Sequence, residues 1–181
     1  ASINASLAVT RDLVDGTIGL DRGALVLVIG DVSYACGREA MWDQHSFLIQ
    51  PFATKVPVMT LLGNHEFDWT IEASYWGGTD SGGECGVPIQ ARFPMPSPPS
   101  SFQRVRENPG ADESAKTQGF SATPWYSFDH GAVHFVLMSS EHDFSPSSEQ
   151  HAWINDDLAS VDRAQTPWVL MASHRPMYVS S

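Results

Sequence analysis

Apolar and polar residues follow one another along the chain in patterns that predict strands alternating with helices. Residues 24–29 and 57–62 are continuous runs of apolar residues, which is typical of strands covered on both faces. Between them, residues 39–53 place apolar side chains on one side at helical spacing, and residues 5–14 show a looser helical pattern. A strand, a helix and a strand joined by short links predict a right-handed βαβ crossover.

The last third of the chain shows the same kinds of pattern. Residues 125–129 alternate in polarity, a turn is expected at 130–131, and residues 132–138 form a buried run, which together predict a β-hairpin. The sequence SSEQ at 147–150 is a capping box that opens a helix with Ile154, Leu158 and Val161 on its inner face. Residues 167–173 then predict another buried strand.

Residues 68–124 interrupt this order. They contain the Gly-, Pro- and Ser-rich sequences GGTDSGGECG and FPMPSPPS and show little periodicity, so we expect an irregular functional loop rather than a second domain. Several aromatic residues lie in it, which indicates that part of it packs. We expect the segment 69–87 to cover the ends of the strands and to shape a substrate entrance, with 95–118 looser and more exposed.

The composition allows a hydrophobic core and narrows the range of partners. The 181 residues are 42% hydrophobic and 17% charged, with a formal net charge of -11. That charge argues against binding of a nucleic-acid polymer, although a bound cation would still allow a small phosphorylated substrate. No apolar run approaches the roughly 20 residues of a membrane span. The sequon at Asn4 favours a secreted glycoprotein, and Cys36 and Cys85 are equally compatible with one disulfide and with two free thiols.

Side chains suited to metal binding follow three of the predicted strands. In open α/β sheets the loops that leave the carboxyl ends of strands converge, so we expect these side chains to meet. Carboxylate, amide, imidazole and phenol groups together suit hard or borderline metals, and a tyrosinate ligand requires a strongly acidic one such as ferric iron. Taken one at a time, each residue also has a simpler interpretation as a turn, a helix cap or a structural histidine. The residues are Asp31 and Tyr34, then Asn64, His65 and Glu66, then His174.

These three motifs, GDxxY, GNHE and a histidine at a strand end, resemble those of the purple acid phosphatases, which are calcineurin-like metallophosphoesterases. The sequences WDQ at 42–44, DSGGECG at 80–86 and EHDF at 141–144 also resemble the large plant-type members, including those described as nucleotide pyrophosphatase/phosphodiesterase-like. The resemblance extends from about residue 7 onward. It implies an α/β fold, the four-layer αββα metallophosphoesterase sandwich.

The resemblance also implies a role for each site residue. Asp31 matches the carboxylate that bridges two metals, and Tyr34 matches the phenolate ligand of Fe(III). Asn64 and His174 match ligands of a divalent metal, which is Zn, Mn or Fe. His65 matches a catalytic histidine that contacts the phosphate or the leaving group. The implied reaction is hydrolysis of a phosphate ester by a metal-bound hydroxide in an extracellular or vacuolar protein.

Two motifs of the family have no counterpart in the sequence. No DxG aspartate precedes Asp31, and no GHxH motif follows His174. We therefore expect residues 1–181 to be a partial catalytic domain, incomplete at both ends, that alone binds metal poorly and is inactive. Three hypotheses remain: an acid phosphatase, a phosphodiesterase or nucleotide pyrophosphatase, and a non-catalytic fragment. The loop 141–143 is expected to be a solvated turn rather than part of the substrate site.

Overall fold

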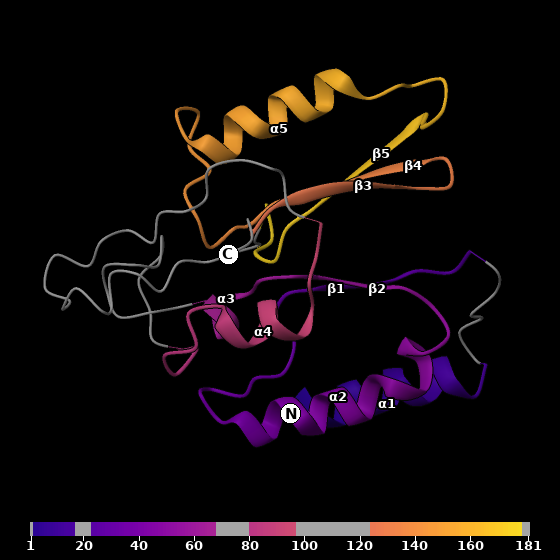
Figure 1. Cartoon of the computed structure of the whole chain (residues 1–181), viewed down its shortest axis with the longest axis vertical. Helices are drawn as coiled ribbons and strands as arrows, with labels where there is room; N and C mark the ends of the chain where they lie inside the picture. Colours follow the sequence, from indigo (N-terminus) through magenta and orange to yellow (C-terminus); the bar gives the residue numbers. More distant parts are fainter. Residues whose placement is uncertain (1, 17–22, 68–79, 97–123, 179–181) are drawn as a thin grey trace, which may run out of the picture.

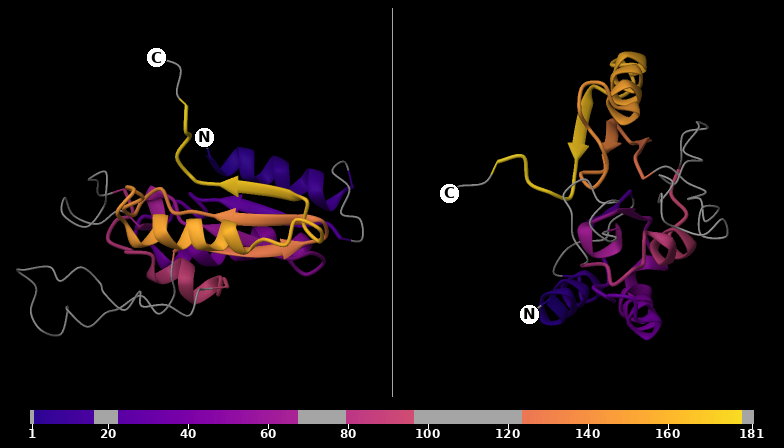
Figure 2. Two further views of the ribbon diagram at one scale, coloured as in Figure 1. Left: turned by 90° about the horizontal axis from the view of Figure 1, so that it is seen from above. Right: turned by 90° about the vertical axis from the view of Figure 1, so that its left-hand side faces the viewer.

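The computed structural model has four layers, with helices outside and two sheets between them (Figure 1). It describes residues 2–16, 23–67, 80–96 and 124–178. The right-hand view in Figure 2 shows the same stacking, so the expected αββα arrangement is confirmed. The outer layers are α1 (Ser2–Val14) with α2 (Glu39–Ala53), and α5 (Glu149–Ser160); the sheets are β1 (Val26–Ile29) with β2 (Val58–Leu61), and β3 (Tyr126–His130), β4 (Val133–Leu137) and β5 (Trp168–Ala172).

The first sheet forms the predicted βαβ unit. β1 and β2 pair in parallel, from Val26 opposite Val58 to Ile29 opposite Leu61, and α2 connects them. α2 buries Trp42 and Phe52. The prediction that residues 24–29 are covered on both faces is wrong, because Ile29 is 47% exposed. An apolar run shows that its residues favour burial, but in this strand only part of the run is covered by other side chains.

The second sheet has the order β3-β4-β5. β3 and β4 form the predicted antiparallel hairpin, and Gly131 (φ +58°) supplies the left-handed backbone of its turn. β5 pairs in parallel with β4 after the α5 crossover. The prediction that residues 167–173 are buried is wrong, because Trp168 is 70% exposed and Leu170 is 43% exposed. β5 lies at one edge of this sheet, and its apolar composition does not ensure that it is covered.

The start of α5 differs from the predicted capping box by one residue. Ser148, not Ser147, is the N-cap, and its Oγ accepts the His151 N–H. Gln150 therefore does not close the box. Its side chain instead accepts the N–H of Ser139 (2.7 Å) and donates to the Ser139 carbonyl (3.0 Å), tying α5 to the end of β4. Ile154 is buried as expected, whereas Leu158 is 39% exposed.

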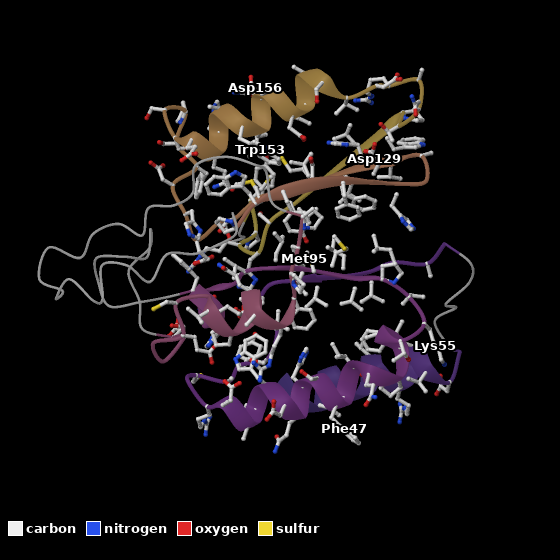
Figure 3. The ribbon with its side chains drawn as sticks, viewed as in Figure 1. Phe47, Lys55, Met95, Asp129, Trp153 and Asp156 are labelled. Carbon is white, nitrogen blue, oxygen red and sulfur yellow. The ribbon has the colours of Figure 1, made fainter. Side chains whose placement is uncertain are left out.

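A buried histidine also fixes α5 to the hairpin. His134 of β4 lies between two carboxylates, with Nδ1 2.6 Å from Asp129 of β3 and Nε2 3.0 Å from Asp157 of α5. Asp157 also accepts a hydrogen bond from Ser127 of β3 (2.6 Å). Burial alone lowers the pKa of His134, but the hydrogen bonds to both aspartates outweigh it and the pKa is raised. Figure 3 shows Asp129 on the hairpin, beneath α5.

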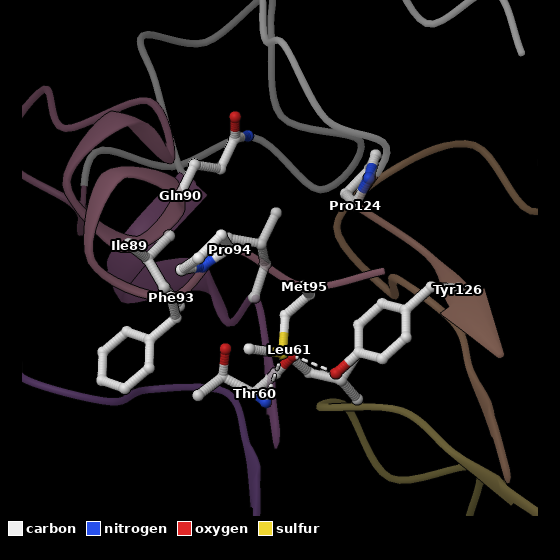
Figure 4. A pocket seen from close by; sticks show the side chains of 10 residues that line it. Thr60, Leu61, Ile89, Gln90, Phe93, Pro94, Met95, Pro124 and Tyr126 are labelled. Atoms are coloured by element: carbon white, nitrogen blue, oxygen red, sulfur yellow. Dashed lines mark hydrogen bonds between the residues drawn. The ribbon is translucent and has the colours of Figure 1, made fainter. Parts of the chain in front are cut away.

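The two sheets pack against each other through apolar side chains and one buried hydrogen bond. Leu61 and Leu137 are fully buried in the cluster between the sheets. The Tyr126 hydroxyl donates to the Thr60 carbonyl (2.7 Å), and Met95 lies beside this contact, where its sulfur accepts the Thr60 N–H (Figure 4). The ends of β1 and β2 are therefore held at a fixed place against the second sheet.

Part of the segment predicted to be irregular is regular and buried. Residues 80–96 include the helix α4 (Val87–Arg92), which buries Ile89 in a cluster with Trp42. A short helix, α3 (Asn64–Phe67), lies at the end of β2. The remaining parts of the predicted loop, 68–79 and 97–123, lie outside the described residues, as does most of the segment expected to be exposed. Within the described ranges, none of the helices has the length and apolarity needed to cross a membrane.

Candidate metal centre

Three of the predicted ligands lie together where the strands end. The His174 Nδ1 atom lies 2.8 Å from the carbonyl oxygen of Ile29, the last residue of β1. The Nε2 atom on the other side of the ring lies 3.2 Å from Asp31 Oδ1 and 3.1 Å from Asn64 Oδ1. The second sheet thus contributes a side chain that reaches the loops of the first. The expected convergence of the three strand ends is observed.

Two glycines make this close approach possible. Gly30 has φ +82°, and a Cβ atom at this position would overlap the His174 ring. A Cβ atom at Gly63 would overlap the Asp31 carboxylate. The glycine that begins each motif is therefore required by packing, and at Gly30 also by a backbone conformation that L-residues rarely adopt.

The Nε2 lone pair of His174 faces the lone pairs of two oxygen atoms. Its Nδ1–H donates to the Ile29 carbonyl, which leaves the Nε2 lone pair of the neutral ring facing Asp31 and Asn64. Both of those atoms are oxygen acceptors, so the three groups repel one another unless a proton or a cation lies among them. A metal-binding histidine typically donates its other ring N–H to a carbonyl in this way. The donor set therefore fits a bound cation.

The pKa shifts of the two ionisable groups follow from this geometry. The hydrogen bond to Asp31 raises the pKa of His174, against the effect of burial. Burial by itself raises the pKa of Asp31, but the hydrogen bond and the charge of His174 outweigh it, and the pKa is lowered. Without a metal, a proton on His174 Nε2 supplies the positive charge that the carboxylate requires.

Tyr34 lies beside the same carboxylate. Burial, together with the hydrogen bond to Asp31, raises the pKa of the Tyr34 phenol to about 12. Only a strongly Lewis-acidic cation would ionise such a phenol near neutral pH. Asp31 (φ +52°) and Tyr34 (φ +51°) both have left-handed backbone, a strain of order 1–3 kcal/mol each that is typical of functional sites.

His65 completes the set of residues predicted from the sequence. Its backbone N–H donates to Asp31 Oδ1 (3.2 Å), and its ring lies 4.5 Å from the Tyr34 ring, centroid to centroid. The His65 Nδ1 atom is buried and has no hydrogen-bond partner among the described residues. The structure thus places His65 at the centre, while its catalytic role stays a prediction.

Glu66, which the sequence grouped with the side chains suited to metal binding, is instead a positioning residue. Its carboxylate is fully buried and accepts the N–H groups of Asp31 (2.8 Å), Val32 (2.7 Å) and Gly63 (3.0 Å). Burial raises the pKa of Glu66 to about 7, although the backbone donors act in the opposite direction. Glu66 connects the loop after β1 to the loop after β2. The acid at the end of the GNHE motif was the signal in the sequence that could have indicated this role.

A second buried acid binds Arg175, the residue that follows His174. Glu141 is fully buried and forms a paired ionic contact with Arg175, whose Nη2 lies 2.8 Å from Oε2 and whose Nε lies 2.9 Å from Oε1. The Arg175 N–H also donates to Ser140 Oγ (3.0 Å). The expectation of a solvated turn at 141–143 is therefore wrong for Glu141, although Asp143 is exposed. His142 is half-buried, and the desolvation of its ring lowers its pKa to about 3.

The two cysteines are free thiols in the structure, Cys36 exposed and Cys85 half-buried. The described residues contain no group of three or more His, Cys, Asp or Glu side chains placed to hold a metal ion. The candidate centre therefore depends on the Asn64 amide and the Tyr34 phenol as well as on Asp31 and His174.

The chain matches known proteins over almost its whole length. The model of the calcineurin-like phosphoesterase family matches residues 3–181. A probable inactive purple acid phosphatase 9 of Arabidopsis thaliana is 40% identical over 91% of this chain and 25% of that protein. A nucleotide pyrophosphatase/phosphodiesterase of Hordeum vulgare is 34% identical over 97% of this chain and 41% of that protein.

The chain is also similar to a solved structure over almost its whole length. The purple acid phosphatase PPD1 from yellow lupin (Lupinus luteus) seeds is similar with a TM-score of 0.75 and 37% identity, over 97% of this chain and 26% of that one. The chain thus spans about a quarter of the length of several relatives that it matches. The resemblance inferred from the three motifs is confirmed, and the chain belongs to the calcineurin-like phosphoesterase family.

Proposed function

We propose that the protein containing this chain hydrolyses phosphate esters at a centre of Fe(III) and a divalent metal, Zn, Mn or Fe. Asp31, Tyr34, Asn64 and His174 would hold the metals. The observation that supports this best is the meeting of the Nε2 lone pair of His174 with the oxygens of Asp31 and Asn64. Three acceptors at one point are unfavourable unless a proton or a cation lies among them, and a metal ion is the cation that this donor set suits.

The residues of this chain have distinct parts in such a site. Asp31 carries two oxygens at the point where both loops meet, which suits a carboxylate that contacts both cations. His65 lies against Tyr34 and is proposed to direct its ring at the phosphate or the leaving oxygen. When bound, the metals supply Lewis acidity that neutralises the phosphate and acidifies water. Glu66 and the two glycines keep the loops in register for this chemistry.

The proposal for ferric iron depends on Tyr34. A phenol whose pKa is raised to about 12 is a poor ligand for weakly acidic cations. Tyr34→Phe should therefore abolish the visible charge-transfer absorbance of the iron-loaded protein and lower its iron content. Tyr178→Phe is the matched control, because Tyr178 is 92% exposed. Undiminished visible absorbance in the Tyr34→Phe variant would contradict the assignment.

Two alternatives have specific support. The barley relative is named a nucleotide pyrophosphatase/phosphodiesterase, which favours diester substrates at the same centre. Four matched relatives are named probable inactive purple acid phosphatases, which favours a non-catalytic protein. Rates on p-nitrophenyl phosphate and on bis(p-nitrophenyl) phosphate separate the monoesterase from the diesterase. No rate above that of an Asp31→Asn variant on either substrate, in a metal-loaded protein, would indicate the non-catalytic alternative.

The substrate and the location are further parts of the proposal. The net charge of -11 disfavours polyanionic partners, so we propose a small phosphorylated molecule as the substrate. The sequon at Asn4 supports an extracellular or vacuolar glycoprotein. Endoglycosidase treatment of the protein from its source should lower its apparent mass, and an unchanged mass would contradict glycosylation.

A further inference from the structure

The Asn64 amide is held in one orientation by a residue outside the predicted ligand set. Asn64 Nδ2 donates a hydrogen bond to Asp80 Oδ2 (2.8 Å), while Asn64 Oδ1 lies 3.1 Å from His174 Nε2. The two ends of an amide are not equivalent, because the nitrogen only donates and the oxygen only accepts. Asp80 carries an acceptor and so selects the end of Asn64 that faces His174.

Asp80 is presented by an anchored segment. It opens the sequence DSGGECG at 80–86, in which Glu84 is buried and accepts hydrogen bonds from the Gly37 N–H (2.9 Å) and from the Trp42 indole (3.1 Å). Gly82 packs so closely against the Cys36 backbone that no Cβ atom fits there. The position of Asp80 is thus set by contacts with the fully buried Trp42 and with the loop before α2.

The opposite orientation of the Asn64 amide would leave no amide oxygen facing the candidate metal centre. A reversed Asn64 would direct its N–H groups at the His174 lone pair and at the Asp31 oxygen, which lie within 3.2 Å of each other. Those acceptors would then be satisfied within the protein, and no amide oxygen would remain for a cation. The same side chain can therefore either complete a cation site or close it.

We propose that Asp80 is a positioning residue that keeps the Asn64 amide oxygen directed at the candidate metal centre. The inference rests on the proposed function, in which Asn64 is a metal ligand. Removing a side chain that hydrogen-bonds a metal ligand typically weakens metal binding by about 10–100-fold. Asp80 would act on the metal through Asn64 and not by direct contact.

Calorimetric titration with Co²⁺ of the protein that contains this chain, freed of its bound metal, tests the proposal. Asp80→Ala should weaken Co²⁺ binding about tenfold or more, whereas Asp80→Asn retains an acceptor oxygen and should stay within about threefold of the wild type. Asp156→Ala removes an equal charge on the outer helix α5 and is the control (Figure 3). Wild-type affinity in Asp80→Ala overturns the proposal. Equal losses in both Asp80 variants also overturn it, since they indicate an effect of charge alone.

A double-mutant cycle isolates the orienting role. Asn64→Asp replaces the amide with a carboxylate whose two oxygens are equivalent, so nothing remains to be oriented. In that background Asp80→Ala should cause no further loss of Co²⁺ affinity. A loss of the same size in both backgrounds overturns the proposal.

Nuclear magnetic resonance of the metal-free chain separates this inference from the proposed function. The side-chain amide protons of Asn64 should shift upfield and exchange faster with water in Asp80→Ala, and should be unchanged in Asp156→Ala. Unchanged Asn64 resonances in Asp80→Ala overturn the positioning role. Failure of the wild-type protein that contains this chain, freed of metal, to bind Co²⁺ would instead count against the proposed metal centre, while the resonances still decide whether Asp80 orients Asn64.

Discussion

Substitution of Gly30 by alanine tests whether the site depends on the close approach of His174. Gly30 (φ +82°) has the His174 ring where a Cβ atom would lie, whereas Gly16 (φ +86°) has nothing within 4 Å. The cost of left-handed backbone, about 1–2 kcal/mol, is therefore common to both substitutions. The collision is specific to Gly30, and overpacking of this kind costs about 1–3 kcal/mol.

The comparison of the two variants gives the magnitude. If the ring moves away, its hydrogen bond to the Ile29 carbonyl is also lost, a further 1 kcal/mol or so. Gly30→Ala should therefore lower the free energy of unfolding by about 2–4 kcal/mol more than Gly16→Ala does. Urea denaturation followed by circular dichroism measures this difference. Equal losses in the two variants would refute the packing argument, and Gly30→Ala should also weaken Co²⁺ binding while Gly16→Ala does not.

Three further outcomes are expected. Arg175→Met leaves the fully buried Glu141 without its cation and should cost about 3–5 kcal/mol in urea denaturation, most of which a simultaneous Glu141→Leu should restore. His134 has a raised pKa in the fold, so its stabilising contribution is complete below its unfolded pKa and is lost as the pH rises through its folded pKa. The thermal midpoint of the wild type should therefore fall relative to that of His134→Gln above about pH 6.5. Parallel pH profiles of the two thermal midpoints would contradict this. Cys36 and Cys85 should both react with a thiol reagent in the unreduced, denatured protein, and a single or absent reaction would contradict the free thiols.

Local patterns were sufficient to predict most of the regular elements. α2, the hairpin and the first parallel connection follow from apolar spacing and turn residues, which act over a few positions of the chain. The covering of a strand is different, because it depends on what packs against it from elsewhere. Ile29 and Trp168 are apolar and exposed for this reason.

The helix α4 was missed because its surroundings are rich in glycine and proline. Gly86 (φ +73°) is its N-cap residue, and the proline at the start of the helix lies where a missing N–H causes no loss. The same residue types that indicate a loop also begin a helix. Only the burial of Ile89 against Trp42 distinguishes the two interpretations, and that contact joins distant parts of the chain.

The candidate site was also predicted only in part. Asp31, Asn64 and His174 follow strands directly, so their convergence could be expected from the order of the elements. The residues that hold them in place could not be assigned, because their partners are backbone groups or side chains far away in the sequence. Glu66 binds N–H groups of two loops, and Asp80 binds one side chain of the preceding helix, α3.

The buried acids of this fold differ in how their charge is compensated, and that difference indicates which one is functional. Glu66 and Glu84 accept hydrogen bonds from the protein's own N–H groups, and Glu141 is paired with Arg175. Asp31 accepts the His65 N–H and a hydrogen bond from Tyr34, but the positive charge beside it comes from a histidine whose neutral form presents a lone pair. A cation at this point would therefore stabilise the folded state by an amount that grows with its concentration. Saturating Co²⁺ should raise the thermal midpoint of the wild-type chain and should raise it less in Asp31→Asn. Equal increases in both would place the bound cation somewhere other than this site.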